Sequence, residues 1–441
     1  MDKQTHTLLL VGSGAREHAI AKAITRSSRP HKLVTFGSSL NPGIAELSAE
    51  YDSGSINDPQ TVCNFARKYG VTLAIIGPEA PLERGVSDAL WNGGIPVVGP
   101  KRDLAMLETS KQFTRNLMAD YQIPGCPQFK HFDSLEGVSD FLAELGEYYV
   151  VKADGLMGGK GVKVAGDHLH SHEEAIQYCQ QLIEAGSSYV IEEKCIGEEF
   201  SMFCFCDGST LKHMPPVQDH KRAYVGDEGP NTGGMGSYSD TGHSLPFIQE
   251  SDILESQQIN GEVVEALRKK TGEGYKGILY GGYMATSSGV RVIEFNARFG
   301  DPEVMNLLTL LDTDIIDIFE AIGNECLDTL DVNFLNKASV CKYTVPVGYP
   351  DAPAKGFPID TSTVEKPDQL FLGAVDQRED GLIATGSRTA AVIGLADTLM
   401  EAEQEAETLV NQVIGNLFHR PDIGTAALIQ KRIDHMGELL G

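Results

Sequence analysis

The sequence predicts a multidomain protein of mixed α/β and α+β class, with an N-terminal doubly wound parallel sheet, a central mixed region and a C-terminal α/β cap. The chain has 441 residues, which is enough for about two to four domains. Its first hundred residues alternate short apolar runs with helical patterns, as parallel sheets do. Later apolar runs are joined by hairpin turns instead. We expect domains at residues 1–108, 109–335 and 336–441.

Composition limits the partners and the location. Lys and Arg total 36 against 62 Asp and Glu, for a formal charge of −26, and so acidic a chain repels nucleic acid and anionic membranes. No apolar run approaches the ~18 residues of a membrane span, and Thr7–Val11 is too short for a secretory signal. The eight cysteines form no Cys-x-x-Cys pair. We therefore expect a cytoplasmic protein with reduced thiols and with neither nucleic-acid nor membrane partners.

The N-terminal sheet is predicted from apolar runs bounded by Gly, Pro or Asn. Helical patterns lie between the runs, and Asp58-Pro59 is a helix start with its capping residue. Ligands of such sheets bind at the carboxyl ends of the strands, where this chain has turns at Gly12-Ser13-Gly14 and Gly77-Pro78-Glu79. The expected strands are Leu8–Val11, Leu33–Phe36, Leu73–Ile76 and Pro96–Val98, and the first helix is Ala15–Thr25.

The first turn, VGSGAREHAI, begins as a dinucleotide-binding fingerprint does but does not complete it. The third glycine of that fingerprint belongs at position 17, where Glu17 stands beside Arg16. A nucleotide-dependent dehydrogenase therefore has only a weak Gly-x-Gly in its favour. No acidic residue follows the second strand, where Phe36-Gly37-Ser38 lies. Tight turns alone would explain the glycines, but not Arg16 and Glu79.

The later elements are expected from periodicity and turn residues. Residues 128–195 have the order helix, strand, glycine-rich loop, strand, helix, strand, and residues 224–243 form a loop without regular periodicity. We expect helices at Arg102–Tyr121, Gln249–Lys270, Glu303 to about Ile322, Leu399–Ile414 and Gly424–His435, and strands within 199–217 and at Tyr280–Thr286, Val290–Phe295, Ser339–Val345 and Ala390–Ile393.

Three alternating histidines, His168, His170 and His172, would share a metal if they lay on a strand. Ser171 followed by Glu174 is, however, a capping box that opens a helix over Glu173–Glu184. The histidines then fall in a loop and a first helical turn, so we expect no metal there.

The stretch VVKADGLMGGKGVKVA places Lys152 at a strand end, followed by the turn Gly158-Gly159-Lys160-Gly161. Glycine lets backbone amides approach a phosphate closely, and lysine adds charge. The spacing is not that of a Walker A motif, because only three residues separate Gly155 from Gly159. A glycine-rich hairpin without a ligand is the alternative.

Two acidic stretches suggest a nucleotide and its metal. In VIEEKCIGEE, the carboxylates of Glu192, Glu193 and Glu199 suit ribose hydroxyls, although a solvated acidic turn explains this segment equally well. In VIEFNARFGDPE, a strand would place Glu294, Asn296 and Arg298 on one face. A carboxylate and an amide oxygen suit Mg²⁺, and Arg298 would reach an anion on the same face. A polar strand face in water is the alternative.

The stretch VQDHKRAYVGDEGPNTGGMG packs Asp219, His220, Lys221 and Arg222 at a strand end, before a long polar loop. Loops of this length in compact domains are usually functional. Cations beside an acid, in a chain this acidic, indicate a site for an anionic substrate.

Taken in order, these stretches resemble the ATP-grasp carboxylate–amine ligases, and within them the phosphoribosylamine–glycine ligase family. The resemblance runs from residue 8 to about 315, and QDHKR with GPNTGGMG is its most specific part. Tyr343–Pro350 departs from the family pattern of the last domain. The matching stretches are GSGAREHA, IIGPEAPLERGV, VVGP, ETSKQFTRNLM, VVKADGLMGGKGV, VIEE with GEE, VQDHKR, GPNTGGMGSYS and VIEFNARFGDPE.

The resemblance implies a central ATP-grasp fold with residues 128–195 as a mobile ATP lid. It implies ligation of glycine to 5-phosphoribosylamine through glycyl phosphate, in purine biosynthesis, with ATP and Mg²⁺ or Mn²⁺ as cofactors and a monomer or weak dimer as the assembly. The Gly12–Arg16 turn would hold the ribose 5-phosphate, which agrees with the affinity of a helix N-terminus and an arginine for phosphate. Glu17 would repel a pyrophosphate across the same turn.

The resemblance also implies the roles of individual residues. Arg298, Asp219 and Lys152 would be catalytic, and Glu294 and Asn296 would hold the metal. ATP would bind at Lys111, Lys152, Gly158, Gly159, Lys160, Gly161, Val162, Glu192, Glu193 and Glu199. The substrates would bind at Gly12, Gly14, Arg16, Glu17, Gly77, Pro78, Glu79, Asp219, Lys221, Arg222, Asn231, Thr232, Gly233, Gly234 and Arg298.

Two further alternatives remain open besides the dehydrogenase. Another ATP-grasp ligase with a different acid or amine would keep the nucleotide motifs, and the 219–236 segment argues against it. A non-catalytic nucleotide sensor would have no need to retain Lys152, Glu294, Asn296 and Arg298 together.

Overall fold

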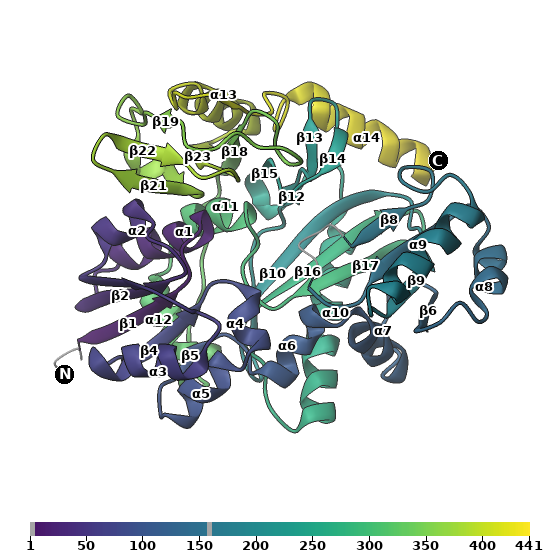
Figure 1. The fold of residues 1–441 in the computed structure, drawn as a ribbon, viewed down its shortest axis with the longest axis horizontal. Coiled ribbons are helices and arrows are strands. Elements are labelled where there is room, and N and C mark those ends of the chain that lie inside the picture. Colours follow the sequence, from purple (N-terminus) through teal and green to yellow (C-terminus); the bar gives the residue numbers. More distant parts are fainter. Residues whose placement is uncertain (1–4, 157–160) are drawn as a thin grey trace.

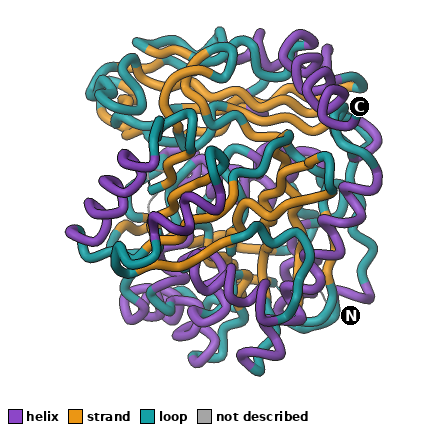
Figure 2. The backbone as a smooth tube through the Cα atoms, turned by 90° about the vertical axis from the view of Figure 1, so that its right-hand side faces the viewer, coloured by secondary structure: helices purple, strands orange, loops and turns teal. Residues whose placement is uncertain are grey.

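The computed structural model describes residues 5–156 and 161–441, and it confirms the expected fold class. The N-terminal sheet lies at one end of the molecule, the C-terminal strands lie above it, and a small sheet with two helices forms the opposite side (Figure 1). Seen after a quarter turn, the C-terminus lies above and the N-terminus below (Figure 2). No helix among the described residues is both long and apolar enough to cross a membrane.

The N-terminal sheet has five parallel strands in the order β3-β2-β1-β4-β5. From β1 the chain adds strands first on one side, β2 and β3, and then on the other, β4 and β5. Ligands of such sheets bind at this switch point between β1 and β4. The turns after β1 and β4 lie side by side there, because the Gly77 amide donates to the Val11 carbonyl (3.0 Å). The elements are β1 His6–Val11, α1 Ala15–Thr25, β2 His31–Gly37, α2 Pro42–Leu47, β3 Glu50–Ser53, α3 Pro59–Lys68, β4 Leu73–Ile76, α4 Glu79–Glu83, α5 Val86–Asn92 and β5 Val97–Val98.

The helix expected over Arg102–Tyr121 is two helices, α6 (Arg102–Thr109) and α7 (Lys111–Asp120). Ser110 separates them with an extended backbone, and its hydroxyl accepts a bond from the Phe113 amide (3.1 Å). Serine favours such a capping position over a helix interior. The break places Lys111 on the first turn of α7.

The segment 128–195 forms a four-stranded antiparallel sheet, β6-β9-β7-β8, with a hydrophobic core of its own. Its first strand was not expected from the sequence. The predicted helix start is confirmed, because Ser171 caps α9 by accepting a bond from the Glu174 amide. The elements are β6 Phe129–Phe132, α8 Val138–Leu145, β7 Tyr149–Ala153, β8 Val162–Val164, α9 His172–Glu184 and β9 Tyr189–Glu193.

The central sheet is antiparallel in the order β11-β10-β16-β17. The segment 224–243, expected to lack regular structure, contains β14, β15 and a 3₁₀ helix at Thr241–His243. The sequence hides these strands because β14 reads EGPN and has no apolar alternation. The elements are β10 Glu198–Asp207, β11 Leu211–His213, β12 Gln218–Asp219, β13 Arg222–Tyr224, β14 Glu228–Asn231, β15 Gly236–Ser239, α10 Glu250–Thr271, β16 Lys276–Thr286 and β17 Gly289–Asn296.

The helix expected from Glu303 to about Ile322 is also broken, into α11 (Glu303–Leu310) and α12 (Ile315–Gly323). Asp314 caps α12 by accepting a bond from the Ile316 amide (3.0 Å). The apolar pattern continues across the break, so periodicity alone does not reveal it.

The C-terminal cap is joined to the central region by strand pairing. The sheet β12-β15-β18-β23-β20 takes two strands from before residue 240, and β15 is antiparallel to β18. A small second sheet, β19-β22-β21, covers one end. The elements are β18 Ala338–Pro346, β19 Pro358–Ile359, β20 Leu370–Leu372, β21 Val375–Arg378, β22 Gly381–Ala384, β23 Ala390–Ala396, α13 Leu399–Val410, β24 Leu417–Phe418 and α14 Ala426–Leu440, with short 3₁₀ helices at Leu327–Thr329 and Pro367–Gln369.

Candidate active site

A cavity of about 690 Å³ lies where the N-terminal sheet, the central sheet, the 128–195 segment and the cap meet. The structure brings most of the predicted site residues to its walls, although they come from positions far apart in the sequence. Among them are Arg16, Glu79, Lys111, Lys152, Val162, Glu192, Glu193, Glu199, Asp219, Lys221, Arg222, Asn231, Thr232, Gly233, Glu294, Asn296 and Arg298.

Arg16 and Arg298 are linked by one carboxylate at the N-terminal side of the cavity. Glu79 Oε2 lies 3.7 Å from Arg16 Nη1 and 3.4 Å from Arg298 Nε. Burial opposes the ionisation of Glu79, but Arg298 and Arg16 outweigh it and hold its pKa below the ordinary value. Arg16 also donates to the Gly77 carbonyl (2.9 Å). Two of the expected substrate residues, Arg16 and Glu79, thus lie beside the expected catalytic Arg298.

Glu17 is placed differently from the expected substrate contact. Its side chain is buried, and Oε2 accepts a bond from the Gly14 amide (2.6 Å). The carboxylate fills the space under the turn, where a Cβ at Gly12 would lie 2.6 Å from Glu17 Cγ. Gly12 also has φ +127°, which glycine adopts readily. Glu17 therefore has a structural role at the position where the dinucleotide fingerprint has its third glycine. Its side chain packs against Gly12 and accepts a bond from the Gly14 amide.

The remaining residues of the two N-terminal turns do not line the cavity. Gly12, Gly14, Gly77 and Pro78 are absent from its described walls, as is Glu17. The Gly14 amide, which we expected to face a phosphate, donates to Glu17 instead. A phosphate at this turn stays a prediction, and it rests on Arg16 and the helix N-terminus.

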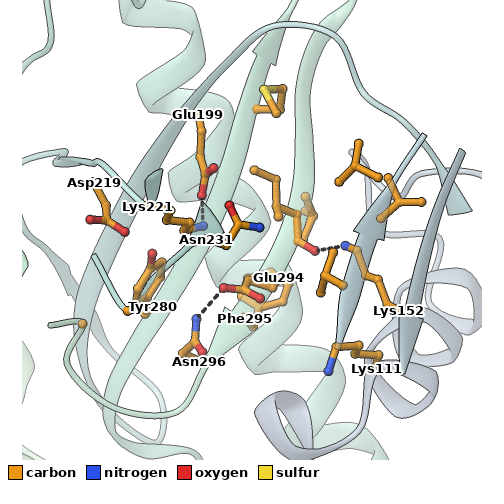
Figure 3. Close-up of a pocket in the computed structure, with 18 of the residues that line it drawn as sticks. Lys111, Lys152, Glu199, Asp219, Lys221, Asn231, Tyr280, Glu294, Phe295 and Asn296 are labelled. Atoms are coloured by element: carbon orange, nitrogen blue, oxygen red, sulfur yellow. Dashed lines mark hydrogen bonds and ion pairs between the residues drawn. The ribbon is translucent and has the colours of Figure 1, made fainter. Parts of the chain in front are cut away.

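Glu294, Asn296 and Arg298 lie together, as a shared strand face predicts. Asn296 Nδ2 donates to Glu294 Oε1 (3.5 Å), and Arg298 Nη2 donates to Asn296 Oδ1 (3.1 Å). In Figure 3, Glu294 lies between the Glu199–Lys221 pair and Lys152. Burial raises the pKa of Glu294, but Lys221 and the other nearby lysines outweigh burial, so that the net pKa is lowered.

These oxygens fit a divalent cation. The carboxylate of Glu294 is held in its charged form, and the side-chain amide of Asn296 lies beside it, with its nitrogen toward Glu294 and its oxygen toward Arg298. Mg²⁺ is commonly held by one or two protein oxygens and completed by substrate phosphates and water. Glu294 and Asn296 are two residues of this kind in the cavity wall.

Glu192 has both carboxylate oxygens occupied by cations. Oε2 lies 2.7 Å from Arg115 Nε, and Oε1 pairs with Lys152, whose ammonium also donates to the Ile293 carbonyl (3.0 Å). A ribose contact was expected for Glu192, but its bonds point to a different task. It orients Lys152 and Arg115 beside the cavity. Glu193 and Glu199 also line the cavity, and Glu199 pairs with Lys221.

The glycine-rich loop is described only in part. Gly158, Gly159 and Lys160 lie outside the described residues, so their expected phosphate contacts stay a prediction. The Gly161 carbonyl accepts a bond from the Ala153 amide (2.8 Å), and Val162 lines the cavity. Lys111 reaches the near side of this loop and donates to the Gly155 carbonyl (3.0 Å).

Asp219 lines the cavity on the side opposite Lys111 and Lys152 (Figure 3). Burial and the carboxylate of Glu303 raise its pKa well above the ordinary value. Gly234, with φ +105°, lies so close that a Cβ there would be 2.7 Å from Asp219 Oδ1. Arg222 pairs with Asp167 (2.8 Å), which also lines the cavity, and thereby ties this wall to the 128–195 segment.

The loop that follows Asp219 returns to the same strand end, where Thr232 contacts Lys221. The amide and the hydroxyl of Thr232 both donate to the Lys221 carbonyl (2.7 and 2.8 Å). This contact places three residues of the loop in the cavity wall, Asn231, Thr232 and Gly233. Gly234 is not part of the wall and packs against the carboxylate of Asp219.

Several charged residues of the cavity wall were not predicted from the sequence, and three of them contact or face predicted site residues. Glu108 binds Arg298 Nη2 (2.9 Å) and accepts a bond from the Ala297 amide (2.7 Å). Arg115 holds Glu192, and Arg388 reaches the cavity from the cap. The stretch ETSKQFTRNLM contains Glu108 and Arg115, so its charged residues were available as a signal. Nothing near Arg388 in the sequence signals its place.

Comparison with known proteins agrees with this arrangement. Family models of phosphoribosylglycinamide synthetase match the chain over residues 6–108 (N domain), 109–304 (ATP-grasp A domain) and 339–426 (C domain). The phosphoribosylamine–glycine ligase of Methanosarcina barkeri is 48% identical over 434 residues, covering 98% of this chain and all of that protein. The same ligase of Methanocaldococcus jannaschii is 48% identical over 442 residues, covering 98% and 99%.

Solved structures give the same result. The phosphoribosylamine–glycine ligase of Thermotoga maritima superposes with a TM-score of 0.80 at 27% identity, covering 95% of this chain and 100% of that one. An ADP complex of N5-carboxyaminoimidazole ribonucleotide synthetase has a TM-score of 0.63 at 15% identity, covering 92% and 96%, and shows a shared fold. By its three consecutive family matches and its full-length relatives, the chain belongs to the phosphoribosylglycinamide synthetase family.

Proposed function

We propose that the protein is an ATP-dependent carbon–nitrogen ligase that joins glycine to 5-phosphoribosylamine, giving glycinamide ribonucleotide, ADP and phosphate in purine biosynthesis. The observation that carries the proposal is the cavity itself. It runs from Arg16 on α1 and Glu79 on α4 to Lys111 on α7 and Lys152 on β7. Cations at both ends suit two phosphorylated ligands, in a chain whose formal charge is −26. The full-length relatives named as this ligase support the choice of substrates.

The reaction follows in two balanced steps. A glycine carboxylate oxygen attacks the γ-phosphorus of ATP, the bond to the bridging oxygen breaks, and ADP leaves. The amine of phosphoribosylamine then attacks the carbonyl carbon of glycyl phosphate, and phosphate leaves with the electron pair of the broken C–O bond. Phosphoryl transfer needs positioning and charge neutralisation rather than a covalent enzyme group. Arg298, Lys111 and Lys152 supply that charge here.

Asp219 is our candidate for holding the amine and taking its proton. A carboxylate whose pKa is raised by burial accepts a proton more readily near neutral pH than an exposed one does. Arg298 is our candidate for contacting the glycine carboxylate and the phosphate transferred to it, because it lies between Glu108 and Glu79 with its side chain at the cavity.

Glu294 and Asn296 are the residues that would hold Mg²⁺, and we extend the proposal to Mn²⁺, which accepts the same oxygen ligands. The bound ion would neutralise phosphate charge as the bond to ADP breaks. Glu192 keeps Lys152 in place beside this pair, since its carboxylate fixes the ammonium between itself and the Ile293 carbonyl.

We further infer that residues 128–195 act as a lid over ATP, within domains at 1–108, 109–335 and 336–441. The separate hydrophobic core of the segment supports movement as a unit. The remaining expectations, a monomer or weak dimer in the cytoplasm, belong to the same proposal.

Omission of single substrates tests the proposed function. ADP release is measured with glycine alone, with phosphoribosylamine alone, with both, and with both but no divalent metal. We expect full-rate release only when both substrates and Mg²⁺ are present. Serine and β-alanine in place of glycine serve as controls for the acid. Equal turnover with either would assign the protein to another ligase of the ATP-grasp type.

A further inference from the structure

We propose that Arg388, on the cap, is a positioning residue for the amine-transfer step. It lies in the connection between β22 and β23 and lines the cavity, although more than eighty residues separate it from the nearest predicted site residue. The proposal rests on the proposed function, and it gives the C-terminal cap a positioning role at the candidate active site. Arg388 acts through its neighbours, because its bonds go to the protein.

The first set of bonds holds the loop that supports Asp219. Arg388 Nη1 donates to the carbonyls of Gly233 (2.5 Å) and Gly234 (3.2 Å). The guanidinium lies flat against this loop, since a Cβ at Gly233 would be 3.2 Å from Arg388 Cζ. Gly234 in turn lies against the carboxylate of Asp219. The position of Asp219 thus depends on a loop that Arg388 fixes.

The second set of bonds holds the turn that follows Arg298. Arg388 Nη1 donates to the Asp301 carbonyl (2.7 Å), and Nη2 lies 3.1 Å from Asp301 Oδ2. Tyr343 donates to the other Asp301 oxygen (2.6 Å), and the Arg388 guanidinium stacks on the Tyr343 ring at 4.6 Å. One side chain therefore connects the wall that carries Asp219 to the wall that carries Arg298.

Only arginine suits this task, because its planar guanidinium donates in several directions and stacks on an aromatic ring at once. The charged groups of the phosphoryl-transfer side have partners of their own. Arg298 pairs with Glu108 and Glu79. Lys152 is held by Glu192, and Lys111 is held by the Gly155 carbonyl. Loss of Arg388 should therefore disturb the alignment of the amine with the acyl phosphate more than the formation of that acyl phosphate. Small displacements of reacting groups cost large factors in rate.

The test measures ADP and amide product together, with the full-length protein and the variants Arg388→Ala and Arg388→Lys. In the wild type the two products should form in equal amounts. In Arg388→Ala we expect more ADP than amide, because unaligned glycyl phosphate is hydrolysed to glycine and phosphate. The KM for phosphoribosylamine should rise roughly tenfold while the KM for ATP stays within about a factor of two. Arg388→Lys keeps the charge beside Asp301 and should restore part of the coupling.

Arg378→Ala is the matched control, since Arg378 is an exposed arginine of the same cap that pairs with Asp376. It should leave the coupling unchanged. If Arg388→Ala does not fold, Tyr343→Phe takes its place: it removes the bond to Asp301, keeps the aromatic ring, and should show a smaller excess of ADP.

A lowered melting temperature with equal ADP and amide and unmoved KM values, in each variant that folds, would overturn the proposal and leave Arg388 a purely structural contact. A wild-type protein that forms no amide at all would overturn the proposed function instead.

Discussion

Charges of opposite sign alternate along one wall of the cavity, from Arg16 through Glu79 and Arg298 to Glu108. Each arginine thus has a carboxylate partner before any ligand binds. Desolvated cations without partners would be costly, so the alternation stabilises the two arginines that we propose contact anionic substrates. The pattern also makes the two arginines interdependent, because they share Glu79.

Replacement of Arg16 tests the phosphate end of this wall. We expect Arg16→Ala to raise the KM for phosphoribosylamine ten- to a hundredfold, since a charge-assisted contact is worth about 1.5–3 kcal/mol. The KM for ATP should stay unchanged, because the residues proposed to bind ATP, such as Lys111 and Lys152, lie in other elements. Steady-state kinetics with each substrate varied in turn gives both values, with Arg378→Ala as the control. A fall in melting temperature with both KM values unmoved would mean that Arg16 only braces the Gly77 turn.

Replacement of Glu294 tests the metal end. Glu294→Gln keeps the shape but removes the charge that would hold Mg²⁺, so transition-state stabilisation of several kcal/mol should be lost. We expect kcat to fall by roughly a hundredfold or more while the KM for glycine changes little. The exposed Glu136 provides the control variant Glu136→Gln. An unchanged kcat at saturating Mg²⁺ would place the metal elsewhere.

Several residue-level expectations could be made from the sequence because each needed only local spacing. The pairing of Glu294 with Asn296 follows from alternation along a strand, and the structure brings both together. Glu17 and Glu192 could not be placed in this way. Their partners, the Gly14 amide and the side chains of Lys152 and Arg115, are set by turn geometry and tertiary packing.

Elements whose ends carry capping signals were predicted closely. α1 has the expected bounds, and α3 begins after the Asp58 cap as the sequence indicates. The two broken helices were missed because Ser110 and Asp314 act as internal caps while the apolar pattern runs on. Short strands such as β14 were missed because cross-strand pairing, rather than local propensity, makes them strands.

The contact between α1 and β20 joins the first helix of the chain to the cap. His18 Nδ1 accepts a bond from the Leu372 amide (2.8 Å), and the nearby Asn41 Nδ2 donates to the Leu372 carbonyl (2.8 Å). Burial, together with Lys22, lowers the pKa of His18 to about 3. The neutral imidazole is therefore required in the folded state.

This contact predicts an acid-sensitive interface. Because the folded pKa of about 3 lies below the ordinary value of 6.5, the contribution of His18 is present above about pH 6.5 and is lost as the pH falls toward 3. Between pH 7 and pH 5 the free energy of unfolding should drop by about 2 kcal/mol from this group alone. Denaturant unfolding of wild type and His18→Gln at both pH values measures it.

The drop between the two pH values should be smaller by that amount in His18→Gln, even if the variant is less stable at pH 7. The exposed His170 supplies the control, since His170→Gln should keep the wild-type drop. An equal drop in all three proteins would contradict a neutral buried His18.

The cavity of the candidate active site lies where separate parts of the chain meet. Helix α1 contributes Arg16, the central sheet Glu294, the 128–195 segment Lys152 and the cap Arg388. The sequence allowed the order of these parts to be predicted, because each has its own pattern. It did not reveal that β15 pairs with β18, which places the cap against the cavity. Pairing between strands a hundred residues apart leaves no local signal.

In the proposed mechanism, ATP activates the glycine carboxylate inside this cavity. Glycine labelled with ¹⁸O in its carboxylate tests this step, because the mechanism moves one carboxylate oxygen to the departing phosphate. With phosphoribosylamine, ATP and Mg²⁺ present, mass spectrometry should find one ¹⁸O atom in each phosphate released and one retained in the amide. Unlabelled phosphate formed together with glycinamide ribonucleotide would contradict the account.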